Sequence, residues 1–451
     1  MSTALIILAA GQGTRMKSDL PKVLHEVAGA PLLVHAMKAG DALDAERTVI
    51  VAGHGADAVE TAARAHDDTI EIAIQTEQKG TAHAVAQAAS ALAGFGGDAI
   101  VLYGDTPFIS AETLSRMADA RTSHDVVVLG FEAADPGRYG RLVMQGDRLE
   151  KIVEFKDASE TEKAISFCNS GVIAAPAALL FDLIAAVGND NASGEYYLTD
   201  IVELANQRGL SATAIACDEA ETMGVNSRAD LAAAEAAFQA RARITALEDG
   251  VTLLAPETVH FAHDTVIGRD TVVEQSVVFG PGVTVESGAR IRAFSHLEGC
   301  HVSRGAVVGP YARLRPGAEL AEDTRIGNFV EIKNATIDEG AKVNHLSYVG
   351  DAHLGAGTNI GAGTITCNYD GVMKHHTEVG RNVFIGSSTM LVAPVTIGDD
   401  AMTASGSVIT KDVPEGALAI ARGDQVVKPG MARKLFDILK SKKEKRRKEA
   451  G

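Results

Sequence analysis

The stretch from residue 267 to residue 297, IGRDTVVEQSVVFGPGVTVESGARIRAFSHL, carries an apolar residue at every sixth position. These positions are Ile267, Val273, Phe279, Val285, Ile291 and Leu297, followed after a one-residue slip by Val302, Val308, Leu314, Leu320, Ile326 and Ile332, and later by Val379, Ile385, Leu391 and Ile397. A six-residue period is typical of a parallel β-helix, in which each hexad gives a short strand and a turn with one side chain inward. A β-sandwich would need alternation with period two and hairpin turns, and neither is evident. We therefore expect a β-helix here.

The first half of the chain follows a different pattern. Up to about residue 225, apolar strand candidates (4–10, 48–52, 70–74, 99–103 and 126–131) are separated by helix-like stretches such as 81–92. This alternation predicts an α/β, Rossmann-like domain. Residues 227–247 are rich in Ala, Glu and Arg without Gly or Pro, which predicts a long connecting helix. We divide the chain into an α/β domain (1–226), a linker helix (227–249), a β-helix domain (250–425) and a basic tail (426–451).

Length and composition narrow the class of protein. A chain of 451 residues exceeds one ordinary core, and a net charge of −17 disfavours nucleic acid as a main partner. No apolar run approaches 18 residues and the N-terminus has no signal-peptide pattern, so we expect a cytoplasmic protein without a membrane span. The cysteines at 168, 217, 300 and 367 are far apart, which argues against structural zinc and suits buried thiols in a reducing compartment. The basic run 440–449 predicts a frayed, solvated end.

A glycine-rich loop, LAAGQGTRMKSDLPK at residues 8–22, directly follows the first predicted strand. Gly11 and Gly13 allow backbone N–H groups to approach a phosphate, and Arg15 and Lys22 supply positive charge. The dinucleotide fingerprint fails because its third glycine is missing, and the P-loop spacing is absent. The remaining order, GxGTRM followed by Pro-Lys, resembles the signature of the sugar-1-phosphate nucleotidyltransferases. The resemblance implies that a sugar phosphate attacks a nucleoside triphosphate and releases pyrophosphate.

Asp105 marks a second site at the end of a predicted strand. It lies at the carboxyl edge of the sheet, where open α/β sheets bind ligands. Triphosphate chemistry needs a divalent cation, and one carboxylate with one carbonyl oxygen suits Mg²⁺. The family resemblance implies that Asn226 is the second ligand, although the residue could also cap the following helix. We expect Mg²⁺ at Asp105 and Asn226.

The same resemblance implies a site for UTP and N-acetylglucosamine 1-phosphate. The amide of Gln75 and the backbone of Gly80 would read uracil, while Arg15 and Lys22 would neutralise charge at the reacting phosphates. The implied nucleotide and sugar ligands are Leu8, Ala9, Ala10, Gly11, Lys22, Gln75, Gly80, Thr81, Tyr103, Gly104, Asp105, Gly140, Glu154, Asn169 and Asn226. Of these, Gly140, Glu154 and Asn169 would hold the amino sugar and its N-acetyl group.

The hexad period breaks between residues 365 and 379, where Asn, Tyr, Lys and His residues accumulate. Such a loop leaving a solenoid is a functional candidate. From residue 3 to Arg422 the chain closely resembles the bifunctional family that acetylates glucosamine 1-phosphate with acetyl-CoA and then couples the product to UTP. The resemblance implies UDP-N-acetylglucosamine as the product, a precursor of bacterial cell wall and lipopolysaccharide. It also implies a left-handed β-helix that assembles as a homotrimer.

Acetyl transfer to an amine needs a base, and a neutral histidine suits that role. We predict His345 as this base, and the resemblance implies that Glu331 orients it. The implied ligands of glucosamine 1-phosphate are Arg315, Lys333, Tyr348, Asn359 and Lys374. Those implied for the acetyl group and coenzyme A are Ala362, Asn368, Tyr369, Ser387, Ser405 and Arg422, most of them through backbone groups, with Ser405 standing where the family has alanine.

Two other classes of function stay open from the sequence. A monofunctional nucleotidyltransferase could carry a purely structural β-helix, which His345, Asn368 and Tyr369 disfavour. A non-catalytic trimeric scaffold would not need Asp105 or Lys22, and both are present.

Overall fold

The computed structural model describes residues 2–449. Met1 and residues 450–451, which fall at the ends of the predicted first domain and tail, lie outside the described residues. The chain divides into two compact units. One runs to Thr245 and includes His260–Thr265, and the other contains Ala246–Val259 and the chain from Val266 onward.

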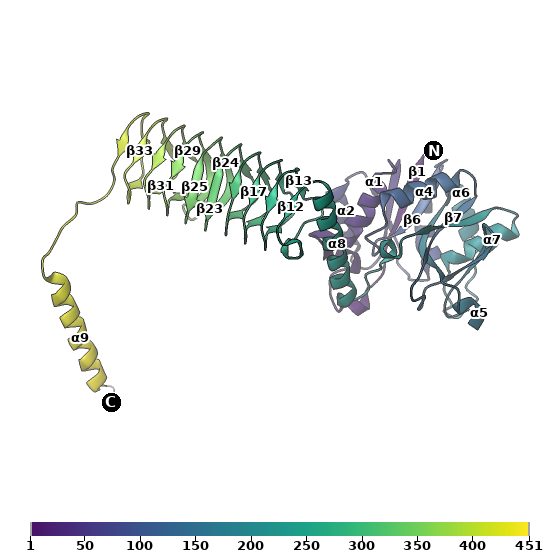
Figure 1. The fold of residues 1–451 in the computed structure, drawn as a ribbon. Coiled ribbons are helices and arrows are strands. Elements are labelled where there is room, and N and C mark those ends of the chain that lie inside the picture. Colours follow the sequence, from purple (N-terminus) through teal and green to yellow (C-terminus); the bar gives the residue numbers. More distant parts are fainter. Residues whose placement is uncertain (1, 450–451) are drawn as a thin grey trace. The chain divides into compact units, whose positions relative to one another are not determined.

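The first unit is built on a nine-stranded sheet (Figure 1). Its main strand order is β11 (Ala212–Cys217), β7 (Val126–Glu132), β10 (Phe167–Pro176), β6 (Asp98–Tyr103), β1 (Thr3–Ala9), β4 (Arg47–Ala52) and β5 (Glu71–Ile74), with β8 (Arg141–Gln145) and β9 (Arg148–Val153) off this path. Neighbours on the main path are parallel except β10, which is antiparallel to β6 and β7. The five strands predicted from the sequence are therefore confirmed. Their parallel pairing places the loops after β1 and β6 at one edge of the sheet.

Helices cover both faces of this sheet because the side chains of β1 alternate between two apolar clusters. Leu5 and Ile7 pack in a cluster with residues of α1 (Leu32–Asp41), α2 (Ala56–His66) and α4 (Ala111–Arg121). Ile6 and Leu8 pack in a second cluster with α3 (Thr81–Ala86), α6 (Ala177–Ile184) and α7 (Ile201–Gln207). A strand buried on both faces reads as a continuous apolar run, as the sequence of β1 does.

The helix predicted over 81–92 is shorter than expected. It ends at Ala86 and tightens into a 3₁₀ turn, Gln87–Ala89. The backbone N–H of Gln87 bonds the Ala84 carbonyl, three residues back, while its side chain donates to the His83 carbonyl at 2.8 Å. The side chain thus occupies an acceptor that continued α-helix would use.

A 21-residue helix, α8 (Arg228–Glu248), begins in the first unit and ends just past its boundary at Thr245. The second unit is a left-handed β-helix (Figure 1). Its named strands pair in parallel. One sheet contains β12 (Thr252–Leu253), β14 (Val272–Val273), β17 (Arg290–Ile291), β20 (Val307–Val308), β23 (Arg325–Asn328), β25 (Lys342–His345), β27 (Asn359–Ile360), β30 (Phe384–Ile385), β33 (Met402–Thr403) and β35 (Leu418–Ala419). The other contains β13 (Val266–Ile267), β15 (Val278–Phe279), β16 (Thr284–Val285), β18 (His296–Leu297), β19 (Cys300–Val302), β21 (Arg313–Leu314), β22 (Ala318–Leu320), β24 (Glu331–Ile337), β26 (Tyr348–Leu354), β28 (Ile365–Cys367), β29 (Thr377–Val379), β31 (Met390–Val392), β32 (Val395–Ile397) and β34 (Val408–Ile409).

The hexad residues form the core of this β-helix. All those named in the sequence analysis are at most 2% exposed except Ile267, which is half-buried on the first strand of its sheet. The predicted loop is present between β28 and β29, with Tyr369 60% exposed. The hexad prediction is confirmed.

The tail differs from the expected frayed end, because Met431–Glu449 forms a helix, α9, with its described side chains exposed. This segment contains no Gly or Pro and many strong helix formers, which favours a helix without tertiary contacts. Over residues 2–449, no helix is long and apolar enough to cross a membrane. All four cysteines are free: Cys168 and Cys300 are buried, and Cys217 and Cys367 are half-buried.

Candidate active sites

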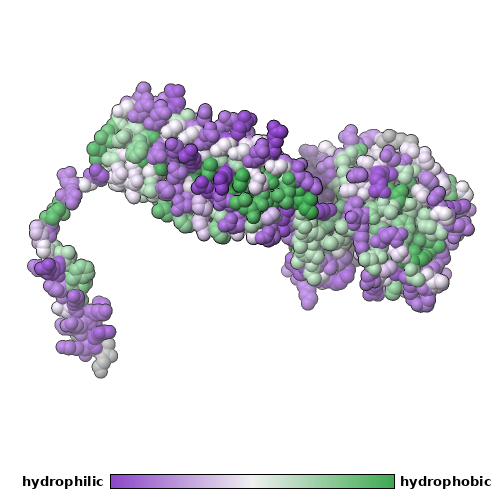
Figure 2. Space-filling view, in the orientation of Figure 1, coloured by the Kyte–Doolittle hydropathy of each residue, from purple (hydrophilic) through white to green (hydrophobic). Residues whose placement is uncertain are grey.

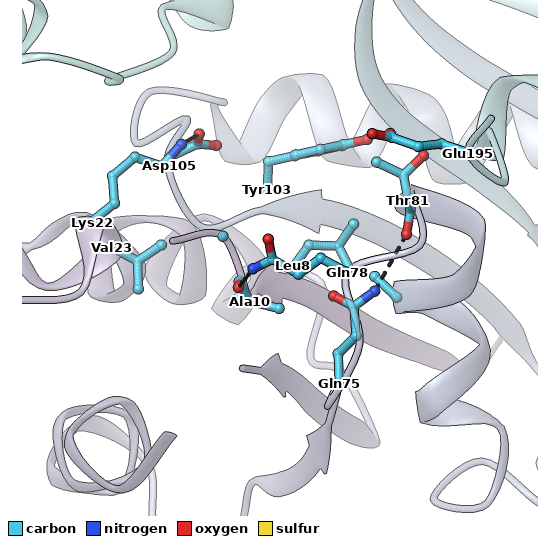
Figure 3. Close-up of a pocket in the computed structure, with 13 residues that line it drawn as sticks. Leu8, Ala10, Lys22, Val23, Gln75, Gln78, Thr81, Tyr103, Asp105 and Glu195 are labelled. Carbon is cyan, nitrogen blue, oxygen red and sulfur yellow. Dashed lines mark hydrogen bonds and ion pairs between the residues drawn. The ribbon is translucent and has the colours of Figure 1, made fainter. Parts of the chain in front are cut away.

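A cavity of about 350 Å³ opens where β1 and β6 end (Figure 3). Because these strands are parallel neighbours, the loops that follow them leave the sheet side by side. The cavity is lined by nine residues predicted for the nucleotide: Leu8, Ala10, Gly11, Lys22, Gln75, Gly80, Thr81, Tyr103 and Asp105. The structure therefore brings the glycine-rich loop, the Gln75 loop and the end of β6 to one site.

The ammonium of Lys22 joins two oxygen donors at this site. Lys22 Nζ forms an ion pair with Asp105 Oδ2 and donates a hydrogen bond to Asn226 Oδ1 at 3.0 Å. The side chains of Lys22 and Asp105 are only 13% and 17% exposed. The ammonium thus stands in for a metal cation between a carboxylate and an amide oxygen, the donor types that suit Mg²⁺. The residues present fit a divalent metal.

Backbone contacts explain why Asn226 points to this site. The N–H of Val225 donates to the Asp105 carbonyl at 2.9 Å, which ties the two segments together. Ser227 rather than Asn226 caps α8, because its Oγ accepts a hydrogen bond from the N–H of Asp230 at 3.2 Å. The helix-cap alternative for the Asn226 side chain is therefore wrong, and its oxygen faces Lys22.

Gly13 lets the glycine-rich loop close over Lys22. Its φ is +61°, and a Cβ there would lie 2.6 Å from the Lys22 Cβ. The other predicted residues do not line the cavity. Ala9 and Gly104 are buried beside it, and Arg15 is exposed on the 3₁₀ turn Thr14–Met16. Asn226 and the predicted sugar residues Gly140, Glu154 and Asn169 are also outside its lining. Arg15 was predicted to lie at the reacting phosphates, and the structure places it outside the cavity lining.

The opposite wall is formed by the loop after β5. Gln75 is 6% exposed, and Gln78 Nε2 donates to the Ala10 carbonyl at 2.8 Å, holding this loop against the end of β1 (Figure 3). Gly80 has a φ of +114°, and a Cβ on it would lie 2.5 Å from the Tyr196 carbonyl oxygen. Only glycine fits this close approach.

The predicted sugar residues lie next to one another beyond Tyr103. A Cβ on Gly140 would lie 3.5 Å from Glu154 Oε1 and 3.6 Å from the Asn169 Cβ. A Cβ on Gly171 would lie 2.6 Å from the Tyr103 ring, so this strand segment packs on the cavity wall. Burial raises the pKa of Glu154, and burial also raises the pKa of Tyr103. The hydroxyl of Tyr103 is therefore neutral, and the carboxyl group of Glu154 is largely removed from water.

His345 lies at the end of β25 with its imidazole exposed. Its Nδ1 bonds Asn328 Oδ1 at 2.9 Å, because the two residues are register partners on β23 and β25. An amide oxygen accepts, so Nδ1 carries a proton, and in the neutral imidazole the lone pair is then on Nε2. The predicted orienting contact from Glu331 is not observed, since Glu331 instead pairs with Arg315 at 2.9 Å. The spacing of residues along the sequence could not show whether Asn328 or Glu331 contacts His345.

A buried carboxylate, Asp351, organises the polar residues beside the loop. It bonds Asn334 at 2.7 Å and also bonds Asn368, and Lys333 Nζ lies 4.0 Å away. Burial alone would raise the pKa of Asp351, but these hydrogen bonds and cations hold it below its ordinary value. A hydrogen bond and the like charge of Lys333 lower the pKa of Lys374. Lys333 and Lys374 therefore lie close enough to influence each other, and two neighbouring cations suit an anion.

The remaining predicted ligands are distributed unevenly. Tyr348 on β26 lies near this group, with its Oη 3.4 Å from the Asn368 amide. Tyr369 projects from the loop, and its Oη donates to the Gly371 carbonyl at 2.6 Å. Asn359 lies on β27 in the other sheet, so the structure does not group it with Tyr348 and Lys333.

The predicted coenzyme A residues form a column along successive coils. The N–H of the residue after Ser387 donates to the Ala362 carbonyl at 2.7 Å, and the N–H of the residue after Ser405 donates to the Ser387 carbonyl at 2.8 Å. Arg422 Nη1 then donates to the Ser405 carbonyl at 2.6 Å. The residues that lie along this one edge of the β-helix are therefore Ala362, Ser387, Ser405 and Arg422.

Sequence reasoning missed several residues at these sites. Gln78 and Glu195 line the first cavity, while Asn328 and Asp351 hold His345 and the lysine pair. Gln78 could have been found, since it lies in the same quoted loop as Gln75. Glu195 could not, because a long-range backbone pairing of Tyr196 with Lys79 and Ala82 brings it there.

Comparison with known proteins agrees with this division. Residues 5–217 match the family model of the MobA-like NTP transferase domain, and residues 376–411 match the bacterial transferase hexapeptide with six repeats. The fold and sites thus define a nucleotidyltransferase joined to a hexapeptide-repeat transferase.

Full-length curated relatives give the particular family. The chain is 72% identical to Bifunctional protein GlmU of Ruegeria pomeroyi over 100% of both chains. It is 71% identical to that of Ruegeria sp., with 98% of this chain and 99% of the relative covered, and 68% identical to that of Cereibacter sphaeroides, with 100% and 99% covered. The chain belongs to the GlmU family of bifunctional proteins. It is an enzyme with UDP-N-acetylglucosamine pyrophosphorylase and glucosamine-1-phosphate acetyltransferase activities, so the alternative of a purely structural β-helix is excluded.

Proposed function

We propose that the cavity of the first unit couples UTP to N-acetylglucosamine 1-phosphate and that the His345 region of the β-helix acetylates glucosamine 1-phosphate with acetyl-CoA. Acetylation comes first, because its product is the sugar phosphate that the first unit uses. The observation that carries the first assignment is the convergence of Asp105 and Asn226 oxygens on Lys22 Nζ.

In the uridylyl step, a phosphate oxygen of the sugar attacks the α-phosphorus of UTP. The new P–O bond forms as the bond to the β-phosphate breaks, and pyrophosphate leaves. The attacking oxygen is already anionic, so the chain supplies no base and acts through positioning and charge. Lys22 binds the phosphates, and the backbone at Gly11 and Gly13 approaches them closely.

A divalent cation such as Mg²⁺ is the cofactor that we assign to Asp105 and Asn226. When bound, it neutralises charge on the phosphates and the leaving pyrophosphate. The chain's own contribution is to hold the carboxylate and the amide oxygen together through the backbone bond between Val225 and Asp105. Lys22 then turns from these oxygens to the phosphates.

The base and the sugar are bound by two other groups of residues in the first unit. Gln75 and Gly80 read uracil, and Thr81 and Tyr103 lie between base and sugar. Adjacent Gly140, Glu154 and Asn169 bind the amino sugar; their mutual packing supports this role.

In the acetyl step, the sugar amine attacks the thioester carbonyl of acetyl-CoA. His345 Nε2 accepts the proton from the amine, a C–N bond forms, and coenzyme A leaves as its thiol after protonation. The hydrogen bond from Nδ1 to Asn328 supports this role, because in the neutral imidazole it places the lone pair on Nε2. Asn368 and Tyr369 border the acetyl group.

The phosphate of glucosamine 1-phosphate binds Lys333 and Lys374, with Arg315, Tyr348 and Asn359 as further ligands. The lowered pKa of Lys374, caused by its hydrogen bond to Lys333 and the charge of that residue, supports an anion site at this lysine pair. Ala362, Ser387, Ser405 and Arg422 bind the coenzyme along the exposed edge of the coils.

We also propose a cytoplasmic homotrimer. Phe294, Tyr311 and Phe329 stack on one corner of successive coils, with ring centroids 4.9 and 5.2 Å apart, and are 48%, 47% and 56% exposed. Apolar residues are also gathered on the face of the β-helix seen in Figure 2. Such exposed apolar surface supports self-association. Light scattering on the purified protein should give three times the chain mass.

The test of the assignment is one matrix of assays. UTP and three other nucleotides are combined with glucosamine 1-phosphate and its N-acetyl form, with and without acetyl-CoA, while pyrophosphate and free thiol are measured. Asp105→Asn should lower pyrophosphate release by about 100-fold or more and leave thiol release intact. Asp119→Asn, an exposed carboxyl on α4, is the matched control. Normal pyrophosphate release by Asp105→Asn would exclude the assignment.

A further inference from the structure

The side-chain amide of Gln75 is hydrogen-bonded to His83. Gln75 Nε2 donates to His83 Nδ1 at 3.0 Å and to the Gly80 carbonyl at 3.4 Å. An amide nitrogen has two N–H groups, so these two acceptors use both. His83 lies on α3 and does not line the cavity, whereas Gln75 does.

This arrangement decides which amide atom faces the ligand. Figure 3 shows the nitrogen of Gln75 turned toward the Thr81 side of the wall and its oxygen turned toward Ala10. Among residues 2–449, no donor bonds Gln75 Oε1. The side chain therefore offers the cavity an acceptor and no donor.

We propose that His83 is a specificity-determining residue, which selects uridine over cytidine nucleotides by fixing the orientation of the Gln75 amide. Uracil carries an N–H at N3, which donates to a carbonyl oxygen, whereas cytosine has a lone pair at N3. An acceptor fixed opposite cytosine N3 leaves two acceptors facing each other without a proton between them. A site built around one hydrogen-bonding partner rejects the analogue that lacks it.

Without an acceptor at Nδ1, only the longer hydrogen bond to the Gly80 carbonyl would favour this orientation of the amide. The flipped amide, with Nε2 facing the cavity, would donate to cytosine N3 and accept nothing from uracil N3. His83 is itself held in place, because its carbonyl accepts the Gln87 side chain at 2.8 Å and its ring is half-buried. His83 is thus a positioning residue, since it acts on the nucleotide only through Gln75.

This inference rests on the proposed reading of the base by Gln75. The experiment compares His83→Leu, which has no acceptor, with His83→Asn, whose side-chain oxygen can occupy the position of Nδ1. For each full-length variant, kcat/KM for UTP and for CTP is measured by pyrophosphate release with N-acetylglucosamine 1-phosphate. Gln75→Ala is measured in parallel, and thermal unfolding of each variant, followed by circular dichroism, reports on folding.

We expect His83→Leu to lower the UTP-to-CTP ratio of kcat/KM by about tenfold or more, mainly through KM for UTP, and His83→Asn to keep most of the ratio. Equal losses for both nucleotides in His83→Leu would mean a merely structural role and overturn the inference. So would a ratio that falls equally in His83→Asn. If Gln75→Ala lowers the ratio but His83→Leu does not, the inference alone fails. If neither variant changes the ratio, the reading of the base by Gln75 fails with it.

Discussion

Lys22 Nζ donates a hydrogen bond to Asn226 Oδ1 at 3.0 Å, joining residues 204 positions apart. The same ammonium pairs with Asp105. A metal ion at the proposed site would therefore compete with Lys22 for the same oxygens, and Lys22 would leave them to reach the phosphates. Both ends of the α/β domain are needed to build this site.

This competition predicts opposite effects of Lys22→Ala on metal binding and on catalysis. The variant should bind Mn²⁺ more tightly in the absence of nucleotide, because a competing cation is removed. Pyrophosphate release should fall by about 100-fold or more, because a cation at the phosphates is lost. Titration calorimetry and the pyrophosphate assay measure the two effects. Lys17→Gln, exposed on the same loop, is the control, and weaker metal binding by Lys22→Ala would contradict the competition.

His345→Ala should reduce acetyl transfer by about 10²–10⁴-fold, because the amine loses its general base. Asn328→Ala should have a smaller effect, about tenfold, because Nε2 remains but its protonation and orientation are less well fixed. Thiol release from acetyl-CoA measures both. His296→Ala, an exposed histidine on β18, is the matched control. If Glu331→Ala reduced the rate more than Asn328→Ala, the orienting role would belong to Glu331.

Gly80→Ala should destabilise the first unit by about 1–3 kcal/mol, because it combines a φ of +114° with a Cβ 2.5 Å from the Tyr196 carbonyl oxygen. It should also raise KM for UTP, since this contact shapes the base-binding wall. Gly96→Ala provides the comparison, as its Cβ would meet no atom within 4 Å. Urea unfolding of the two variants measures the difference in their free energies of unfolding. Equal stability would show that the Tyr196 backbone shifts to accommodate the added Cβ at little cost.

Glu154→Gln should stabilise the protein near neutral pH while impairing sugar binding. Burial raises the pKa of Glu154 in the folded state, so the unfolded chain loses this proton first as pH rises. Ionisation therefore favours unfolding above about pH 4.5, and the gain from Gln should be absent below that pH and present at pH 7. Thermal unfolding across this range checks the sign. Glu112→Gln, an exposed residue on α4, should show no such gain.

Much of the fold was predictable from local pattern. The six-residue period identified the β-helix because each inward residue must be apolar to fill a narrow core. The inward residues Val273, Phe279, Val285, Ile291 and Leu297 are accordingly at most 2% exposed. The strands of the α/β domain were found because double-sided burial demands continuous apolar runs. Helix ends were less predictable, since a single side-chain contact from Gln87 tightened the end of α3.

The candidate sites were predictable as sets of residues and not as contacts. Gly11 and Lys22 were found because phosphate binding favours a glycine-rich loop with positive charge after a strand, whereas Gln75 was selected by the family resemblance. The pairing of His345 with Asn328 rather than Glu331 depends on the register of β23 and β25, which the hexad period leaves open.

The sequence by itself therefore determined the two architectures, the glycine-rich loop and the identity of the polar residues that break the hexad period. Only the tertiary structure decided that Lys22 occupies the oxygens of Asp105 and Asn226, that Arg15 stays outside the cavity, and that His83 orients Gln75. The physical reason is the distance along the chain over which each effect acts. Periodicity and turn chemistry act between near neighbours, whereas the direction of a side chain at a site depends on strands and loops that meet only after folding.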